Sequence, residues 1–111
     1  MRTIDMEKIF YPIGEVVEKT GINPSTIRYW EKHFVELSPR KTEKGTRRFT
    51  ADEIETLRLI NHLVKERGMT VKGAGQMLKD NRENTIKNWE VVKKLKEIKK
   101  MLTSIRDEIE E

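Results

Sequence analysis

Residues 13–33 read IGEVVEKTGINPSTIRYWEKH, and this stretch predicts two short helices joined by a tight turn. Apolar residues within 13–20 recur at helical spacing, and Gly21 stands where glycine is favoured just beyond a helix end. Asn23 suits the N-cap of a second helix and Pro24 suits its first position. Two short helices with such a turn are typical of a helix-turn-helix.

The second helix is expected to turn an apolar face inward and a polar face outward. Ile27, Trp30 and Phe34 are spaced by three and four residues and predict the inward face. The outward residues are Ser25, Arg28, Tyr29 and Lys32. Such side chains bond phosphate oxygens, and Arg also reads guanine in the major groove, so this face is a candidate DNA contact. An ordinary solvated helix face is the alternative.

A basic hairpin is predicted after the two helices. Pro and Gly interrupt the helical periodicity, and residues 42–45 favour a turn between strands at 37–41 and 46–49. Five cations and one carboxylate lie within residues 39–48, and their net charge of +4 equals that of the whole chain. Such a cluster on a protruding hairpin is typical of a wing that contacts a phosphate backbone. A solubilising sheet edge is the alternative.

Two more helices follow the hairpin. Thr50 and Glu53 match the capping-box pattern at the start of a helix that we expect to end at Gly68. Thr70 suits the N-cap of the next helix, which residues 80–81 interrupt.

The C-terminal segment predicts one long helix with an apolar seam. From Asn84 onward the sequence has no Gly or Pro, and its apolar residues alternate between spacings of four and three. They are Val91, Leu95, Ile98, Leu102, Ile105 and Ile109. A single helix of this length needs a second copy to bury the seam, so we expect a homodimer. The helix is basic in its first half and acidic over residues 101–111, which favours antiparallel pairing.

Composition excludes several classes of function. The chain has no cysteine, which excludes disulfides, thiolate metal sites and cysteine nucleophiles. It has no apolar run long enough to span a membrane, so we expect a cytoplasmic protein, associated with the nucleoid when DNA-bound. His33 and His62 fall on different helices and do not predict a metal site. We expect no cofactor and no enzyme, because no nucleophile, base and orienting acid stand together.

Taken in order, these segments resemble the MerR-type transcriptional regulators. The similar segments are IGEVV at residues 13–17, TGI at 20–22, TIRYWE at 26–31, LSP at 37–39, GTRRF at 45–49 and DEI at 52–54, followed by Leu57. The resemblance extends from about Tyr11 to about Lys79, and TIRYWE together with the Gly-x-Arg-Arg-aromatic wing is its specific part.

The resemblance implies a mainly α fold. A winged helix-turn-helix DNA-binding domain would occupy residues 1–80, and a coiled-coil dimerisation helix over residues 84–111 would pair antiparallel with its mate. Members of the family bind pseudo-palindromic promoter DNA, and RNA polymerase at the promoter is a further implied partner. By matching position, Arg28 and Tyr29 would contact DNA from the recognition helix and Arg47 would contact the backbone from the wing.

The full expected DNA-binding set spans both elements. Its members are Ser25, Thr26, Arg28, Tyr29, Lys32, Lys41, Lys44, Arg47 and Arg48. Thr26 would lie near the base-reading end, while Trp30 and Phe49 would belong to the core. Because successive strand residues face opposite ways, Arg47 and Arg48 are not expected to make the same contact.

Two departures from the family pattern affect the functional prediction. Thr46 stands where a tyrosine is often found in the wing, which removes one phosphate or packing contact. The sequence ends at Glu111 without the effector-binding region of many members, so we expect a sequence-specific regulator without a separate effector domain. Two rival functions are a non-regulatory DNA-binding role, in chromosome organisation or recombination support, and a coiled-coil protein-interaction module.

Overall fold

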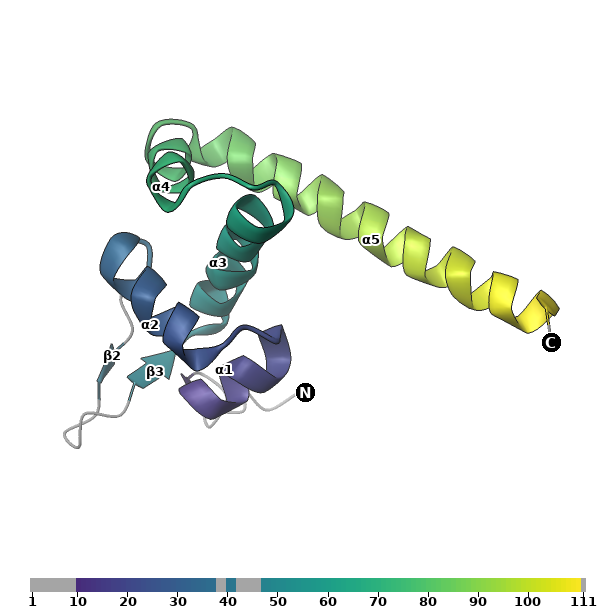
Figure 1. Cartoon of the computed structure of the whole chain (residues 1–111), viewed down its shortest axis with the longest axis horizontal. Helices are drawn as coiled ribbons and strands as arrows, with labels where there is room; N and C mark the ends of the chain where they lie inside the picture. Colours follow the sequence, from purple (N-terminus) through teal and green to yellow (C-terminus); the bar gives the residue numbers. More distant parts are fainter. Residues whose placement is uncertain (1–9, 38–39, 42–46, 111) are drawn as a thin grey trace, which may run out of the picture. The chain divides into compact units, whose positions relative to one another are not determined.

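The computed structural model describes residues 10–37, 40–41 and 47–110. These residues form two compact units, one ending at Gln76 and the other beginning at Met77. Figure 1 shows that nearly all of the described chain is helical, with a single small sheet. The prediction of a mainly α fold is therefore confirmed.

The first unit contains a helix-turn-helix, a small sheet and a third helix. Its elements are β1 (Tyr11–Pro12), α1 (Ile13–Thr20), α2 (Pro24–His33), β2 (Arg40–Lys41), β3 (Arg47–Phe49), α3 (Ala51–Asn61) and the π-helical turn η2 (His62–Glu66). Helix α4 (Val71–Asp80) begins in this unit and ends in the second.

The sheet has three antiparallel strands in the order β1-β3-β2. Tyr11 of β1 lies opposite Phe49 of β3, and on the other side of β3 Lys41 lies opposite Arg47. The expected hairpin strands pair at Arg40–Lys41 and Arg47–Phe49, within the predicted strands at 37–41 and 46–49. Leu37 lies outside strand β2, and residues 38–39 and 42–46 lie outside the described residues. Strand β1 adds a third strand, so β3 is the central strand of the sheet rather than an edge.

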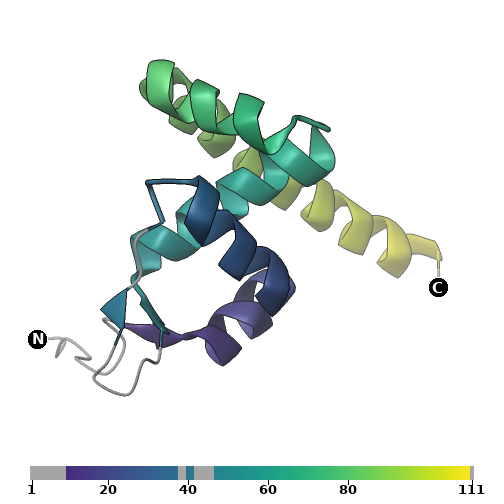
Figure 2. The same ribbon diagram turned by 60° about the vertical axis from the view of Figure 1, so that its left-hand side comes forward.

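The core of the first unit is made by side chains from all three helices and from β3. The largest fully buried ones are Trp30, Phe34, Phe49, Ile27, Leu57, Ile60, Leu63 and Val16. Helix α1 packs against α2, α3 and β3, so that the three helices surround the core and the sheet closes one end (Figure 2). The expected inward face of the second helix is therefore buried.

Local hydrogen bonds define the ends of α3 and α4. Thr50 Oγ1 accepts from Glu53 N at 3.1 Å and Glu53 Oε1 accepts from Thr50 N at 2.9 Å, which is the predicted capping box. Helix α3 does not continue as an α-helix to Gly68, because its last turn widens into η2. Thr70 Oγ1 accepts from Gly73 N at 2.9 Å at the start of α4.

The second unit is dominated by α5 (Arg82–Glu110), a helix of 29 residues. It begins two residues before the predicted Asn84 and is about 43 Å long at 1.5 Å per residue. Thr85 Oγ1 donates to Asn81 O at 2.7 Å in its first turn. None of the described helices has the length and apolar character of a membrane span.

Candidate DNA-binding surface

A turn of three residues fixes the point at which α2 begins. Gly21 has a φ of 72°, and its N–H donates to Val17 O at 2.8 Å to end α1. Asn23 Oδ1 then accepts from Ser25 N at 2.9 Å and caps α2, with Pro24 in its first turn. Glycine adopts this left-handed conformation without the steric cost that a Cβ brings, so the turn depends on Gly21.

The predicted contact residue Ser25 takes part in this cap. Its side chain is exposed, and Oγ donates to Asn23 Oδ1 at 2.7 Å. The hydroxyl proton is therefore directed toward the cap in the free chain, and a bond from Ser25 to a phosphate would need that proton to be redirected.

The outward face of α2 carries the predicted recognition residues. Arg28 and Lys32 are exposed and stand one helical turn apart, and Tyr29 beside them is 50% exposed. Thr26 is half-buried nearer the start of the helix. A guanidinium, an ammonium and a phenol thus share one solvent-facing surface, and all three are groups that donate hydrogen bonds to phosphate or base acceptors.

The aromatic ring of Tyr29 is paired with a second ring. His33, one turn further along α2, has its ring centroid 4.3 Å from that of Tyr29, with 46° between the ring planes. The DNA-binding set predicted from the sequence does not include His33. The i,i+4 spacing of two aromatic residues on an exposed helix face is the signal that points to this pair.

The wing strands bring cations opposite one another. In the register of β2 and β3, Arg40 lies opposite Arg48 and Lys41 lies opposite Arg47. The register thus places Lys41, Arg47 and Arg48 on two adjacent strands. The predicted contact Lys44 lies outside the described residues.

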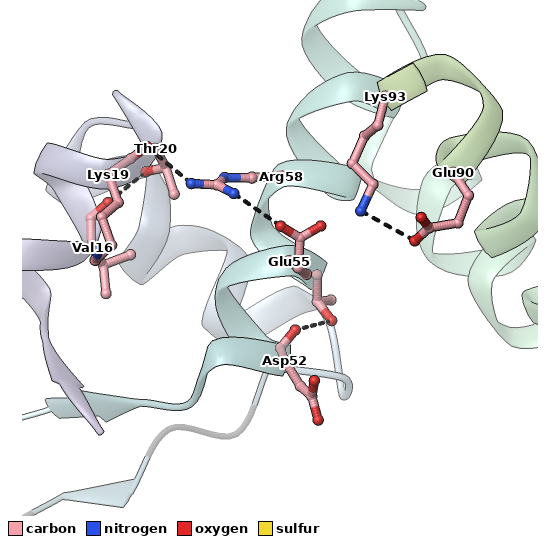
Figure 3. A network of polar contacts seen from close by, with 9 residues as sticks. Val16, Lys19, Thr20, Asp52, Glu55, Arg58, Glu90 and Lys93 are labelled. Atoms are coloured by element: carbon pink, nitrogen blue, oxygen red, sulfur yellow. Dashed lines mark hydrogen bonds and ion pairs between the residues drawn. The ribbon is translucent and has the colours of Figure 1, made fainter. Parts of the chain in front are cut away.

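Arg58 of α3 bonds to the last turn of α1, just before the turn that leads into α2 (Figure 3). Its Nη2 donates to the Lys19 carbonyl at 3.2 Å, and its Nη1 pairs with Glu55 Oε1 at 2.9 Å. Thr20 beside this carbonyl donates from Oγ1 to Val16 O at 2.8 Å. The C-terminal turn of α1 is thereby held from two sides, which positions the turn that precedes α2.

In the second unit, the six predicted seam residues of α5 are all exposed. Their exposed fractions range from 50% for Ile98 to 77% for Ile109. A row of large apolar side chains this exposed is unusual on a helix in water and makes this face a candidate contact surface. Off the seam, Lys93 pairs with Glu90 at 3.1 Å and its ammonium lies 5.8 Å from the Trp89 ring centroid.

No group of three or more metal-ligating side chains stands together in the part of the chain that the structure describes. The ring of His62 is instead engaged with the next turn of its own helix, where Nδ1 lies 2.6 Å from Glu66 Oε1.

Comparison with known protein families identifies the family to which this architecture belongs. Residues 11–81 match the family model described as "MerR HTH family regulatory protein". The chain belongs to the MerR family. The match begins at β1 and extends past the end of α4, so it includes the helix-turn-helix, the wing strands and α3.

Individual MerR-family relatives are similar over most of the chain. The transcriptional regulator GlnR of Bacillus anthracis is 32% identical over 104 residues, which cover 90% of this chain and 77% of GlnR. The mercuric resistance operon regulatory protein of Bacillus cereus is 34% identical over 68 residues. Those residues cover 61% of this chain and only 51% of the mercuric resistance regulator, so the chain corresponds to about half of that relative.

Two solved structures of MerR-family proteins are also similar. HiNmlR, a regulator described as lacking the sensor domain and bound to promoter DNA, is 26% identical with a TM-score of 0.58. The similar region covers 84% of this chain and 78% of HiNmlR. A MerR-family regulator from Bacillus thuringiensis is 22% identical with a TM-score of 0.51, covering 90% of this chain and 96% of that one. The second likeness shows the shared fold.

Proposed function

We propose that this MerR-family chain is a transcriptional regulator that binds pseudo-palindromic promoter DNA, sequence-specifically, as a homodimer. The observation that carries the proposal is the solvent-facing surface of Arg28, Tyr29 and Lys32 on the second helix of the helix-turn-helix. The similarity to HiNmlR supports it, because that protein is bound to promoter DNA in its crystal structure.

The residues of the first unit divide into two kinds of contact. Arg28 of α2 is suited to bidentate recognition of guanine in the major groove, with Thr26 near the same end of the helix. Tyr29, Lys32 and Ser25 are suited to phosphate oxygens, which position the helix without reading sequence. The wing cations Lys41, Lys44, Arg47 and Arg48 extend the contact along the backbone, where neutralised phosphates release counterions.

The dimer is proposed from the seam of α5 within a dimerisation helix over residues 84–111. If two copies pair antiparallel with their Lys100 residues at the centre, each of the six seam residues lies opposite a seam residue of the other copy. The six layers are of three kinds, and each kind occurs twice because the dimer is symmetric. The layers pair Val91 with Ile109, Leu95 with Ile105 and Ile98 with Leu102 of the other copy. Every exposed seam residue then faces an apolar one, which an offset register does not achieve at the ends.

The charges that flank the seam support the same pairing. Lys94 and Glu108 occupy equivalent flanking positions, one residue before Leu95 and Ile109. In antiparallel pairing, positions that precede a seam residue lie next to positions that precede a seam residue on the mate. Lys94 of one copy therefore comes near Glu108 of the other. Parallel pairing would instead place Lys94 near Lys99 of the mate, because positions that precede and follow the seam then meet, and two ammonium groups would repel.

Selection from a random DNA pool, followed by affinity measurements across salt concentrations, tests the proposal. We expect one inverted-repeat site whose log Kd rises with log salt, because each phosphate contact releases a counterion. Arg28→Ala should weaken binding to that site by about tenfold or more, as the loss of a base contact does. Lys87→Ala, which removes an exposed cation from α5, is the matched control and should bind as wild type.

The rival functions predict different results. A chromosome-organising role predicts uniform binding with no selected site. A protein-interaction module predicts that Arg28→Ala and Arg47→Ala leave function intact.

For the dimer, sedimentation of the chain without residues 84–111 should show a monomer, and a persistent dimer would refute the seam. Transcription from a promoter carrying the selected site, with RNA polymerase and with and without the chain, tests the regulatory role directly.

A further inference from the structure

We infer that His33 is a positioning residue for DNA binding, which holds the ring of Tyr29 in the orientation that Tyr29 uses against DNA. The inference rests on the proposed function and adds a residue that no family pattern or sequence motif on this chain assigned to it.

The geometry couples the two side chains directly. Their ring centroids are 4.3 Å apart and their planes are inclined by 46°, a close tilted pair on successive turns of α2. Both residues are exposed, so water surrounds most of each ring. Their contact removes part of each ring from that water. Aromatic rings in contact attract each other beyond the area that they bury.

The pair restricts the freedom of Tyr29 before DNA arrives. An aromatic side chain on a helix has two accessible χ1 orientations, and contact with His33 favours one of them. If the phenol reaches DNA from that orientation alone, binding weakens in proportion to the fraction of Tyr29 that leaves it. Equal occupancy of two orientations corresponds to about twofold per head, and to about fourfold for a dimer that uses two heads.

A purely structural role for His33 predicts a different outcome. A histidine in the last turn of a helix interacts favourably with the helix dipole and the last carbonyls. Its removal would then lower the stability of the chain but leave the DNA affinity of the folded protein unchanged. The two roles are therefore separated by measuring stability and affinity on the same variants.

The experiment is a double-mutant cycle on the full chain with the selected DNA site. We expect His33→Ala and His33→Leu to weaken binding by about fourfold, since both remove the ring. His33→Phe should restore wild-type affinity because it retains the ring. In a Tyr29→Ala background, His33→Ala should have no further effect. The Tyr29 ring-proton resonances of the free chain should shift in His33→Ala and His33→Leu, which lose the neighbouring ring.

Each contrary outcome is distinct. If His33→Phe binds as weakly as His33→Ala, the imidazole itself contacts DNA and the positioning role is overturned. It is also overturned if His33→Ala weakens binding equally with and without Tyr29, or if His33→Ala binds as wild type while Arg28→Ala does not. A wild-type chain that binds no selected site contradicts the proposed function itself.

Discussion

The guanidinium of Arg58 donates to the backbone carbonyl of Lys19, 39 residues away, at 3.2 Å. This bond joins the last turn of α3 to the last turn of α1, immediately before the turn that precedes the recognition helix. The last carbonyls of a helix have no partner within the helix, so a cation at this position satisfies a group that would otherwise depend on water. The contact therefore orients the helix-turn-helix as well as stabilising it.

Replacing Arg58 by Gln should lower the free energy of unfolding. The bond is charge-assisted, but the Arg58 side chain is 40% exposed, so screening by water limits the expected loss to about 1 kcal/mol. Urea unfolding followed by circular dichroism measures it. Arg67→Gln, an exposed arginine of the same unit, is the control and should change stability little; equal losses in both variants would argue against a specific role of the carbonyl contact.

Gly21→Ala should destabilise the chain because a Cβ is strained at a φ of 72°. The expected cost is about 1–2 kcal/mol, the penalty of the left-handed conformation for a residue with a Cβ. Gly14→Ala is the matched control in α1, where no atom outside its own helix backbone lies within 4 Å of the added Cβ. That variant should gain about 0.5–1 kcal/mol from helix propensity. Thermal unfolding of both variants should show shifts of opposite sign.

Two glycines of α4 should also respond differently to alanine. A Cβ on Gly75 would lie 3.8 Å from Phe34 Cε1, an ordinary contact, so Gly75→Ala should stabilise the chain by about 0.5–1 kcal/mol. A Cβ on Gly73 would lie 3.0 Å from Thr70 Oγ1, the atom that caps α4, so Gly73→Ala should gain less or lose stability. Equal unfolding midpoints for the two variants would contradict the crowding at Gly73.

The proposed register of the dimer predicts the effect of exchanging charges. Lys94→Glu should weaken dimerisation, because it places a second carboxylate near Glu108 of the mate at two symmetric positions. Adding Glu108→Lys should restore it, since the ion pairs reform with reversed polarity. Each exposed pair contributes about 0.5 kcal/mol, so the change in dimer Kd should be about fivefold and should diminish with salt. Sedimentation equilibrium measures it, and a double variant as weak as the single one would exclude this register.

Features encoded by neighbouring residues were predictable from the sequence. The ends of α1 and α2 follow from Gly21 and from Asn23-Pro24, because helix capping depends on atoms within about four residues along the chain. The capping box of Thr50 and Glu53 and the periodic seam of α5 have the same local origin. The spacing of Ile27, Trp30 and Phe34 likewise predicted the outward face that carries Arg28 and Tyr29.

Other features depended on chain segments that meet only after folding. Strand β1 pairs Tyr11 with Phe49, a partner that no local pattern around Tyr11 specifies, and this pairing moves β3 from the edge to the centre of the sheet. The bond from Arg58 to Lys19 is equally non-local, and on sequence alone Arg58 is only one cation on the polar face of a helix. Local hydrogen bonds and apolar periodicity thus determined the helices and the candidate contact residues. The tertiary structure decided which distant backbone groups hold those helices in place. Contacts between distant groups form only when the core brings α1, α3 and the sheet together.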